Sequence, residues 1–504
     1  MSYSMSEQYD IAVIGSGLGG LSCGVILAKE GLRVCIVEQH SVVGGCLQSF
    51  SRNGALFDTG IHYIGSMGEG QIMRQFLRYY GVDNQITTLP VNVDAYETIC
   101  IGNEQYQLPV GEDRFIEAMS RRFPAEAEGI RVLVSKIMEV KNSISLSLLR
   151  EGRISDVGAQ RYMSVAAYDV ICEHIHNATL RDIFGSCSLL FGGEKESATF
   201  YQYAMVMGSN IEGAYRILGG TQSLANAMAQ QIESLGGKVL TGEKVTQIVT
   251  NGSSEVDHIN TLSGKQIRAK HYISAMHPSQ TFELIDATPA LKRPFISRMQ
   301  QLRNTYGMFS VYATLRKGII PFQNTFYLIH DNQSPWFSSE AMAGKAGSAS
   351  LMLSFRPSSD GKWTDAVSII TPVAYADVEK WADTKVGYRG SDYEAWKRQV
   401  SQLMIERAES VCSGLTSAIS DVYASSPLTF RDYTLTPQGS AYGVMKNCRN
   451  PLPTIIPTQT KLRNLHLTGQ SIYVPGAIGV TMTAAMTCAD IVGEEYLAKK
   501  IAQV

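Results

Sequence analysis

Three glycines and one acidic residue near the start of the chain have the types and spacing that can hold a pyrophosphate and a ribose. Gly15, Gly17 and Gly20 follow an apolar run at residues 11–14, and Glu38 follows a second apolar run. In such a motif the first glycine makes a tight turn, the second admits the phosphates, and the third lets a helix pack on a strand. The acid accepts hydrogen bonds from ribose hydroxyls and would repel a 2′-phosphate, so we predict a dinucleotide other than NADP here.

These residues need a particular order of elements around them, and the flanking sequence supplies it. Residues 11–14 are apolar enough for a strand buried on both faces of a parallel sheet. A helix is expected at residues 21–27, capped by Gly31, followed by a second strand at residues 33–37. Free N–H groups at the start of that helix can bind phosphate. We therefore predict an α/β fold with a Rossmann-like dinucleotide-binding domain.

The residues after Glu38 favour FAD over NAD. The pair Gly44 and Gly45 is followed by a short hairpin around Gly54, where an NAD domain would normally enter its next strand–helix–strand unit. A hairpin at this place is typical of flavoproteins of the glutathione-reductase type, although an ordinary glycine-rich loop is the alternative. Near the C-terminus, a strand ending at residues 468–470 precedes a helix rich in small residues. The N-terminus of that helix could stabilise negative charge on a reduced flavin.

Six short motifs resemble the phytoene desaturase and retinol saturase group of flavoproteins, and together they span almost the whole chain. They are GSGLGG at residues 15–20, GGCLQSF at 44–50, FDTGIHYIG at 57–65, GGTQSLA at 219–225, GSAYG at 439–443 and LTGQ at 467–470. The resemblance implies FAD contacts at Gly15, Gly17, Gly20, Glu38, Val245 and the region of Gly469. With their neighbours, the expected cofactor-binding residues are Gly15, Ser16, Gly17, Gly19, Gly20, Glu38, Gln39, Gly44, Gly45, Cys46, His62, Val245, Gly469, Gln470, Gly479 and Val480.

The resemblance also implies an FAD-dependent oxidoreductase that acts on carbon–carbon double bonds of an apolar isoprenoid or lipid. We expect saturation, with desaturation or isomerisation on the same fold as the alternative, and a flavin amine oxidase or a non-enzymatic prenyl-lipid carrier as further alternatives. A substrate with few polar groups must be bound by burying its methylenes, which predicts an apolar tunnel. Four side chains are candidates for the proton donor: His62, Tyr63, Tyr442 and Tyr473.

No second strand–GxGxxG–helix unit is found, so NAD(P)H is expected at most as a transient electron donor at the flavin. We assign residues 1–80, 212–282 and 455–504 to a discontinuous FAD-binding domain. Residues 81–211 and 283–454 are assigned to an inserted α+β substrate-binding domain, helical over 110–205 and rich in strands over 300–375. An amphipathic helix is expected at residues 163–175.

Composition restricts the partners and the location. A net charge of −2 gives no reason to expect nucleic acid, and nine cysteines without a CxxC pair indicate neither a disulfide framework nor a zinc site. We predict no metal site. The polar N-terminus and the absence of a long apolar stretch lead us to expect a cytoplasmic protein with possible peripheral membrane contact. The sequence does not indicate the oligomeric state.

Overall fold

A parallel sheet forms the centre of one half of the molecule. The computed structural model describes residues 8–330 and 335–504. Its central strands all run in the same direction and lie side by side in the order β10 (Lys238–Leu240), β2 (Val34–Val37), β1 (Gln8–Ile14), β13 (Gln266–Ser274) and β19 (Leu465–Leu467). Ile11, Ala12, Val13 and Ile14 are all buried, as a strand covered on both faces requires.

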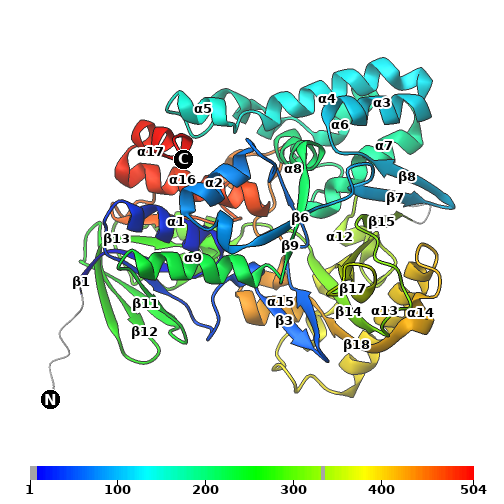
Figure 1. Cartoon of the computed structure of the whole chain (residues 1–504). Helices are drawn as coiled ribbons and strands as arrows, with labels where there is room; N and C mark the ends of the chain where they lie inside the picture. The colour runs from blue at the N-terminus through cyan, green and yellow to red at the C-terminus, as the bar shows by residue number, and fades with distance from the viewer. Residues whose placement is uncertain (1–7, 331–334) are drawn as a thin grey trace.

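Helices cover the parallel sheet, and an antiparallel hairpin extends it. Helices α1 (Leu18–Lys29), α9 (Gln222–Ser234) and α16 (Gly476–Val492) pack together beside β1, as Figure 1 shows. The hairpin consists of β11 (Val245–Thr250) and β12 (Val256–Thr261), which pairs with β13. The prediction of an α/β fold with a Rossmann-like FAD-binding domain is confirmed, whereas the domain boundaries stay a prediction.

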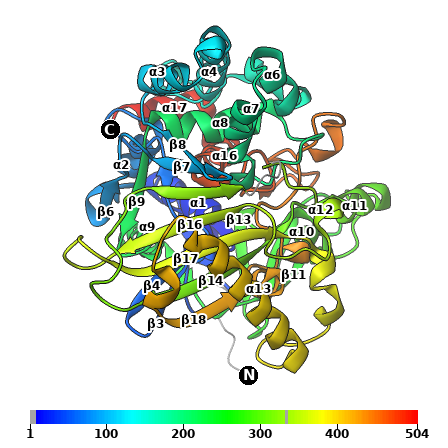
Figure 2. The same cartoon turned by 90° about the vertical axis from the view of Figure 1, so that its right-hand side faces the viewer.

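A second, mostly antiparallel sheet lies in the other half of the molecule (Figure 2). Its strand order is β18 (Ile419–Ser425), β14 (Gly307–Leu315), β17 (Thr364–Val373), β16 (Leu351–Pro357), β15 (Phe326–His330), β7 (Glu97–Ile101) and β8 (Glu104–Leu108). Phe309, Val311 and Leu353 form an apolar core with Val400 and Met404 of helix α13 (Ser391–Glu409). Since side chains alternate along a strand, the residues between these point to the opposite face.

Helices cover the end of the molecule opposite α13. They form the upper layer in Figure 1 and are α3 (Glu112–Arg122), α4 (Ala127–Lys141), α5 (Leu146–Arg150), α6 (Ala167–His174), α7 (Ala178–Gly185) and α8 (Phe200–Glu212). The amphipathic helix expected at residues 163–175 is shorter than predicted. Residues 165–166 are extended because Phe200 donates its N–H to the Val165 carbonyl and Ala167 donates to that of Ala198.

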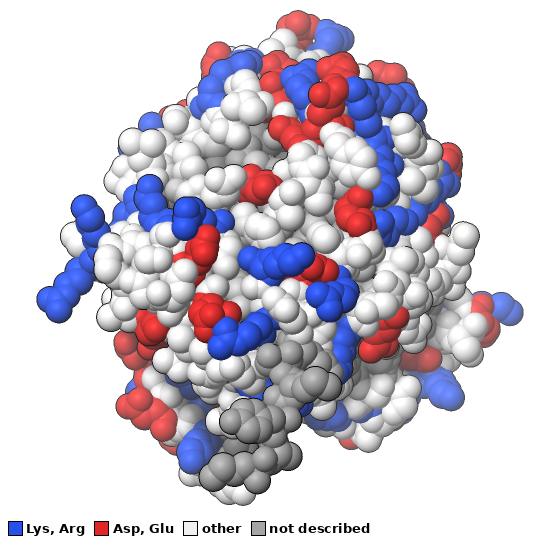
Figure 3. Space-filling view, turned by 90° about the vertical axis from the view of Figure 1, so that its left-hand side faces the viewer, with Lys and Arg blue, Asp and Glu red and all other residues white. Residues whose placement is uncertain are grey.

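Short strand pairs connect the two halves. The hairpin of β3 (Ser49–Arg52) and β4 (Ala55–Asp58) stands where the sequence predicted it, and β9 (Ala214–Leu218) pairs with both β5 (Ile64–Gly65) and β6 (Thr87–Pro90). Within the two described ranges, no helix has both the length and the apolarity needed to span a membrane. Basic and acidic side chains are interspersed on the face of the molecule that Figure 3 shows.

Candidate active site

A cavity of about 620 Å³ lies between the two sheets, and we call it the main cavity. The turn between β1 and α1 lines it, together with the carboxyl ends of β2, β13 and β19. This is the edge of a doubly wound sheet at which ligands bind. Its other walls come from the second sheet and from helix α15 (Pro427–Thr434). A ligand in the main cavity would therefore touch both halves of the molecule.

The turn between β1 and α1 leaves room for a phosphate beside Gly17. This residue has a φ of −63°, and a Cβ built on it would meet no atom within 4 Å, so its open side faces the cavity. The first amides of α1 have no partner within the helix and can donate to an anion. Beside Gly19 in the first turn of α1, the Thr468 hydroxyl is buried without a hydrogen-bond partner among the described residues. These features fit a bound pyrophosphate.

Glu38 is fixed at the position expected for a ribose contact. One carboxylate oxygen accepts hydrogen bonds from the Ser16 N–H (2.9 Å) and the Ser16 hydroxyl (2.6 Å), and the other accepts from the His40 N–H (2.9 Å). Glu38 is buried but lines the main cavity. Because a carboxylate oxygen can accept more than one hydrogen bond, the oxygen bound by His40 retains capacity for a ribose hydroxyl.

Another part of the main cavity is formed by the turn after β19, which packs beside Gly19, and by the start of α16. Gly469 (φ +102°) adopts a backbone conformation that favours glycine, and Gly476 and Val480 bring the first turns of α16 to the cavity. A ligand group there meets the positive end of a helix dipole, so developing negative charge would be stabilised. This arrangement suits the ring of a flavin.

Most of the residues predicted from the sequence come together around this one cavity. Those that line it are Gly15, Ser16, Gly17, Gly19, Glu38, Gln39, Gly44, Gly45, Cys46, His62, Val245, Tyr442, Gly469, Gln470 and Val480. Gly20 and Gly479 do not line it. Their Cβ atoms would collide with the carbonyl oxygens of Gly15 and Val474, so both glycines serve close backbone packing instead. Burial raises the pKa of the Cys46 thiol, which keeps it protonated.

Two of the four candidate proton donors do not reach the main cavity. Tyr63 donates its hydroxyl hydrogen to the buried Glu97, and its side chain does not line the main cavity. Tyr473 is buried against the ring of Tyr201, with ring centroids 5.5 Å apart. The structure thus places only His62 and Tyr442, of the four, where a substrate could contact them.

The two remaining candidates are both uncharged at neutral pH. Burial lowers the pKa of His62 to about 4; the negative charge of Asp58 opposes this shift and the positive charge of Arg216 adds to it. Burial raises the pKa of Tyr442, whose hydroxyl donates to the Leu189 carbonyl oxygen at 2.8 Å. Proton donation in this site would therefore come from a neutral N–H or O–H group.

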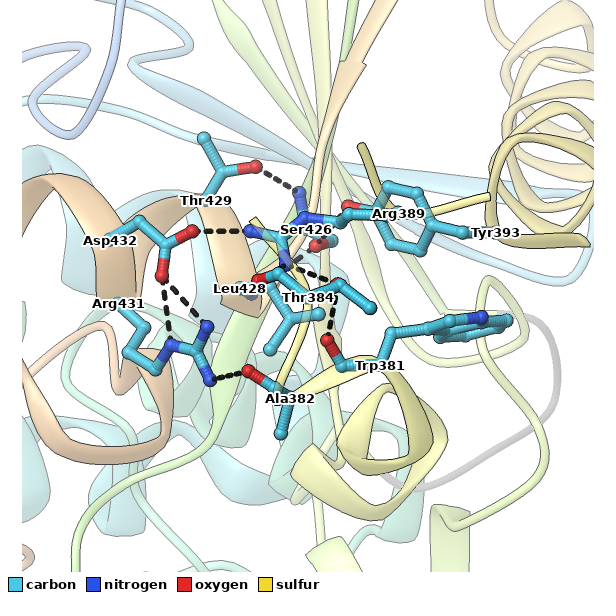
Figure 4. A network of polar contacts seen from close by, with 10 residues as sticks. All are labelled: Trp381, Ala382, Thr384, Arg389, Tyr393, Ser426, Leu428, Thr429, Arg431 and Asp432. Atoms are coloured by element: carbon cyan, nitrogen blue, oxygen red, sulfur yellow. Dashed lines mark hydrogen bonds and ion pairs between the residues drawn. The ribbon is translucent and has the colours of Figure 1, made fainter. Parts of the chain in front are cut away.

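Helix α15 closes the ribose end of the main cavity, and no motif in the sequence had indicated this contact. The His40 ring stacks on Tyr433 (centroids 5.7 Å apart), and a ring nitrogen of His40 lies 2.6 Å from the Tyr433 carbonyl oxygen. Figure 4 shows how the helix is held: Arg389 donates to Asp432, and Arg431 donates to the Ala382 carbonyl oxygen at 2.8 Å. Because His40 and Tyr433 are far apart in sequence, only the folded chain reveals this wall.

The second sheet provides an apolar floor beside His62. Met308, Met352 and Ile370, which point away from α13, line the main cavity together with Leu189. Next to this floor, a second cavity of about 600 Å³ shares His62 with the main cavity, and we call it the side cavity. It contains charged side chains. The expected apolar tunnel therefore describes only part of the space around His62.

Comparisons with known proteins agree with this geometry. The chain is 26% identical to all-trans-retinol 13,14-reductase of Danio rerio, over 96% of this chain and 86% of the relative. It is 24% identical to prolycopene isomerase 1 of an Oncidium hybrid cultivar, over 98% of this chain and 86% of the relative. Among solved structures, wild-type putrescine oxidase bound to putrescine superposes with a TM-score of 0.63 at 15% identity, covering 96% of this chain and 99% of that one.

A family model also matches almost the entire chain. Residues 18–492 fit the model described as flavin containing amine oxidoreductase. The match includes all of α1, the second sheet and all of α16, and of the residues that line the main cavity only the turn at residues 14–17 lies before it. The prediction of FAD as cofactor is confirmed. The chain therefore belongs to the family of flavin-containing amine oxidoreductases.

Proposed function

We propose that this protein saturates a carbon–carbon double bond of an apolar isoprenoid or lipid. The observation that carries the proposal is the apolar floor of Met308, Met352 and Ile370, which lies in the same cavity as Gly469 and the start of α16. A chain of methylene or methyl groups on this floor would be held by burial, at about 0.8 kcal/mol for each buried CH₂. The named activity of the retinol reductase relatives supports the same reaction.

Saturation adds one hydride and one proton across the double bond. A bound FAD, once reduced, supplies the hydride, and the protein must hold the substrate and provide the proton. Tyr442 and His62 are the candidates that line the cavity, and each could donate from its neutral form. The surrounding apolar side chains exclude water, which would otherwise compete for the reacting groups.

Isomerisation of a polyene is the second candidate function. It is favoured by the prolycopene isomerases, which match 98% or more of this chain. Oxidation of an amine is less well supported by the site. The carboxylates that line the main cavity, Glu38, Glu243 and Glu283, belong to its ribose end, so none lies beside the apolar floor to bind an ammonium group.

Anaerobic incubation with a polyene tests the proposal directly. Protein reduced chemically in the presence of FAD is mixed with all-trans-retinol or a linear carotene, and the product is analysed by mass spectrometry. A gain of two hydrogens supports saturation, whereas an unchanged mass with a new retention time supports isomerisation. The oxidised protein, tested in parallel, should remove two hydrogens if desaturation is the true direction. An unchanged substrate in every arm refutes all three.

The source of electrons and the location are parts of the same proposal. We propose that a nicotinamide dinucleotide reduces the flavin by transient docking, which anaerobic loss of the yellow colour on adding NADH or NADPH would test. We further propose a cytoplasmic enzyme that collects its substrate at a membrane surface, because apolar molecules partition into bilayers. Co-flotation with lipid vesicles would test that contact.

A further inference from the structure

The side cavity carries positive charge that the protein only partly neutralises. It is lined by Asp58 at the end of β4, Arg216 on β9 and Arg356 on β16. Asp58 is the only carboxylate among these lining residues, so one anion faces two cations. Asp365 acts on Arg356 from the neighbouring strand, but it does not line the cavity and is partly exposed to solvent.

Arg216 is almost completely buried without a carboxylate bonded to it. Only 5% of the residue is exposed, and its guanidinium donates to Asn324 Oδ1 (3.1 Å), Ser354 Oγ (3.2 Å) and the Thr325 carbonyl (3.1 Å). The guanidinium also lies 3.9 Å from the centre of the Phe326 ring. Burial lowers its pKa to about 9, so the group remains charged at neutral pH. These neutral partners orient the cation without cancelling its charge.

Arg356 is the more accessible of the two cations. Its Nη1 lies 3.8 Å from Asp58 Oδ2, and the structure records no hydrogen bond from its guanidinium to another described residue. The other oxygen of Asp58 accepts hydrogen bonds from the Ser49 hydroxyl (2.7 Å) and the Thr221 N–H (2.8 Å). The planar guanidinium of Arg356 therefore keeps its N–H groups for a bidentate anion such as a carboxylate.

One face of the second sheet joins the side cavity to the main cavity. Along β16, Met352 lines the main cavity, while Ser354 and Arg356 line the side cavity. The paired strand β17 shows the same change from one cavity to the other. Ile370, which pairs with Met352, lines the main cavity. Ser368, which pairs with Ser354, lines the side cavity. Alternate residues on a strand are about 7 Å apart, so the floor changes from apolar to cationic over roughly 14 Å.

We propose that the side cavity binds the carboxylate of an amphipathic substrate whose apolar chain passes His62 and lies on the floor of the main cavity. The substrate class is then a long-chain or isoprenoid acid. Its acidic end pairs with Arg356 and lies in the field of Arg216, and its chain reaches Met352 on the apolar floor roughly 14 Å away. This inference rests on the proposed function, because it assumes that the apolar chain is the substrate of the flavin.

Binding to the FAD-loaded, oxidised protein tests the inference without turnover. All-trans-retinoic acid and all-trans-retinol share one polyene and differ in the end group, so their dissociation constants isolate the contribution of the carboxylate. We expect the acid to bind at least tenfold more tightly than the alcohol. Arg356→Gln should weaken acid binding roughly 10- to 100-fold and change alcohol binding less than about twofold. Arg356→Lys, which keeps the charge but loses the bidentate geometry, should fall between the two.

Controls separate this effect from misfolding and from other anions. Arg463→Gln removes an exposed cation paired with Glu255 and should leave both affinities unchanged. Each variant must retain wild-type FAD content and thermal stability. If Arg356→Gln instead slows reduction by NADPH more than by NADH, and leaves acid binding intact, the cavity serves the electron donor and the inference is overturned. Equal affinity of the wild-type protein for acid and alcohol also overturns it.

The outcome can be distinguished from that of the proposed function. A protein that saturates polyenes but shows no preference for the acid overturns this inference alone. A protein that binds the acid through Arg356 but never changes the mass of a polyene overturns the proposed saturation alone.

Discussion

Replacing Gly17 by valine should strongly weaken FAD binding without harming the fold. Among the glycines that the structure describes, Gly17 alone combines an ordinary φ (−63°) with open space around its missing Cβ. Valine can therefore adopt the native backbone conformation. Its methyl groups would project into the part of the cavity where the first amides of α1 can donate hydrogen bonds to phosphate. The substitution tests the cofactor site separately from protein stability.

The expected loss of FAD affinity follows from the hydrogen bonds between the pyrophosphate and the backbone amides that would be lost. If the pyrophosphate is displaced from two amides, at about 1.5–3 kcal/mol for each bond to a charged group, affinity falls by roughly 3–6 kcal/mol. This corresponds to a dissociation constant roughly 100 to 20,000 times larger. Gly17→Ala, with one methyl group, should give a smaller loss. Unfolding of the FAD-free variants should lie within about 0.5 kcal/mol of wild type.

The measurement is the flavin-to-protein absorbance ratio after purification, followed by titration of stripped protein with FAD. Gly20→Ala is the contrasting variant, because its Cβ would collide with the carbonyl of Gly15 and should lower folding stability itself. If Gly17→Val is purified with wild-type FAD content and affinity, the pyrophosphate does not lie at this turn, and the assignment of the site is wrong.

Three further predictions concern pH, the α15 wall and the proton donor. Burial lowers the pKa of His330 to about 3, so on acidification this histidine is protonated in the unfolded chain before it is protonated in the folded one. Between pH 7 and pH 5 the free energy of unfolding should therefore fall by about 2 kcal/mol. Urea titrations of His330→Gln at both pH values should lack this part of the decrease. Asp432→Asn leaves Arg389 buried without its anion and should lower the free energy of unfolding by about 3 kcal/mol in urea titrations. It should also weaken FAD binding in fluorescence titrations. Unchanged stability would show that the pair of Asp432 and Arg389 does not hold α15 in place. Tyr442→Phe should lower kcat about 100-fold with little change in KM if this hydroxyl supplies the proton, and an unchanged kcat would exclude it.

The part of the candidate site near the N-terminus could be predicted because short, contiguous stretches of sequence determine it. The turn at Gly15 and Gly17, the acid at Glu38 and the hairpin around Gly54 each depend on neighbours within a few positions, and all three stand where the sequence indicated. The same reasoning could not tell which glycines face the ligand. Gly20 is required for packing against the Gly15 carbonyl, and sequence spacing alone does not distinguish that role from a cofactor contact.

The parts that the sequence did not reveal depend on which way a side chain points and on distant pairing. His62 and Tyr63 are adjacent, but only His62 faces the main cavity, while Tyr63 binds Glu97. Arg216 and Arg356 come from different strands and meet only because β9 and β16 approach in the folded chain. No periodicity or local motif marks either arginine, so the charged side cavity could not be predicted.

The pairing of β1 with β13, and of β13 with β19, also has a consequence for biosynthesis. β13 ends at Ser274 and β19 begins at Leu465, so this wall of the cofactor site is completed only after β19 has left the ribosome. At about 5–20 residues per second, β13 waits roughly 10–40 s before β19 is synthesised and can pair with it. We therefore expect stable flavin binding only after β19 has docked, and truncation before β19 should yield a colourless product.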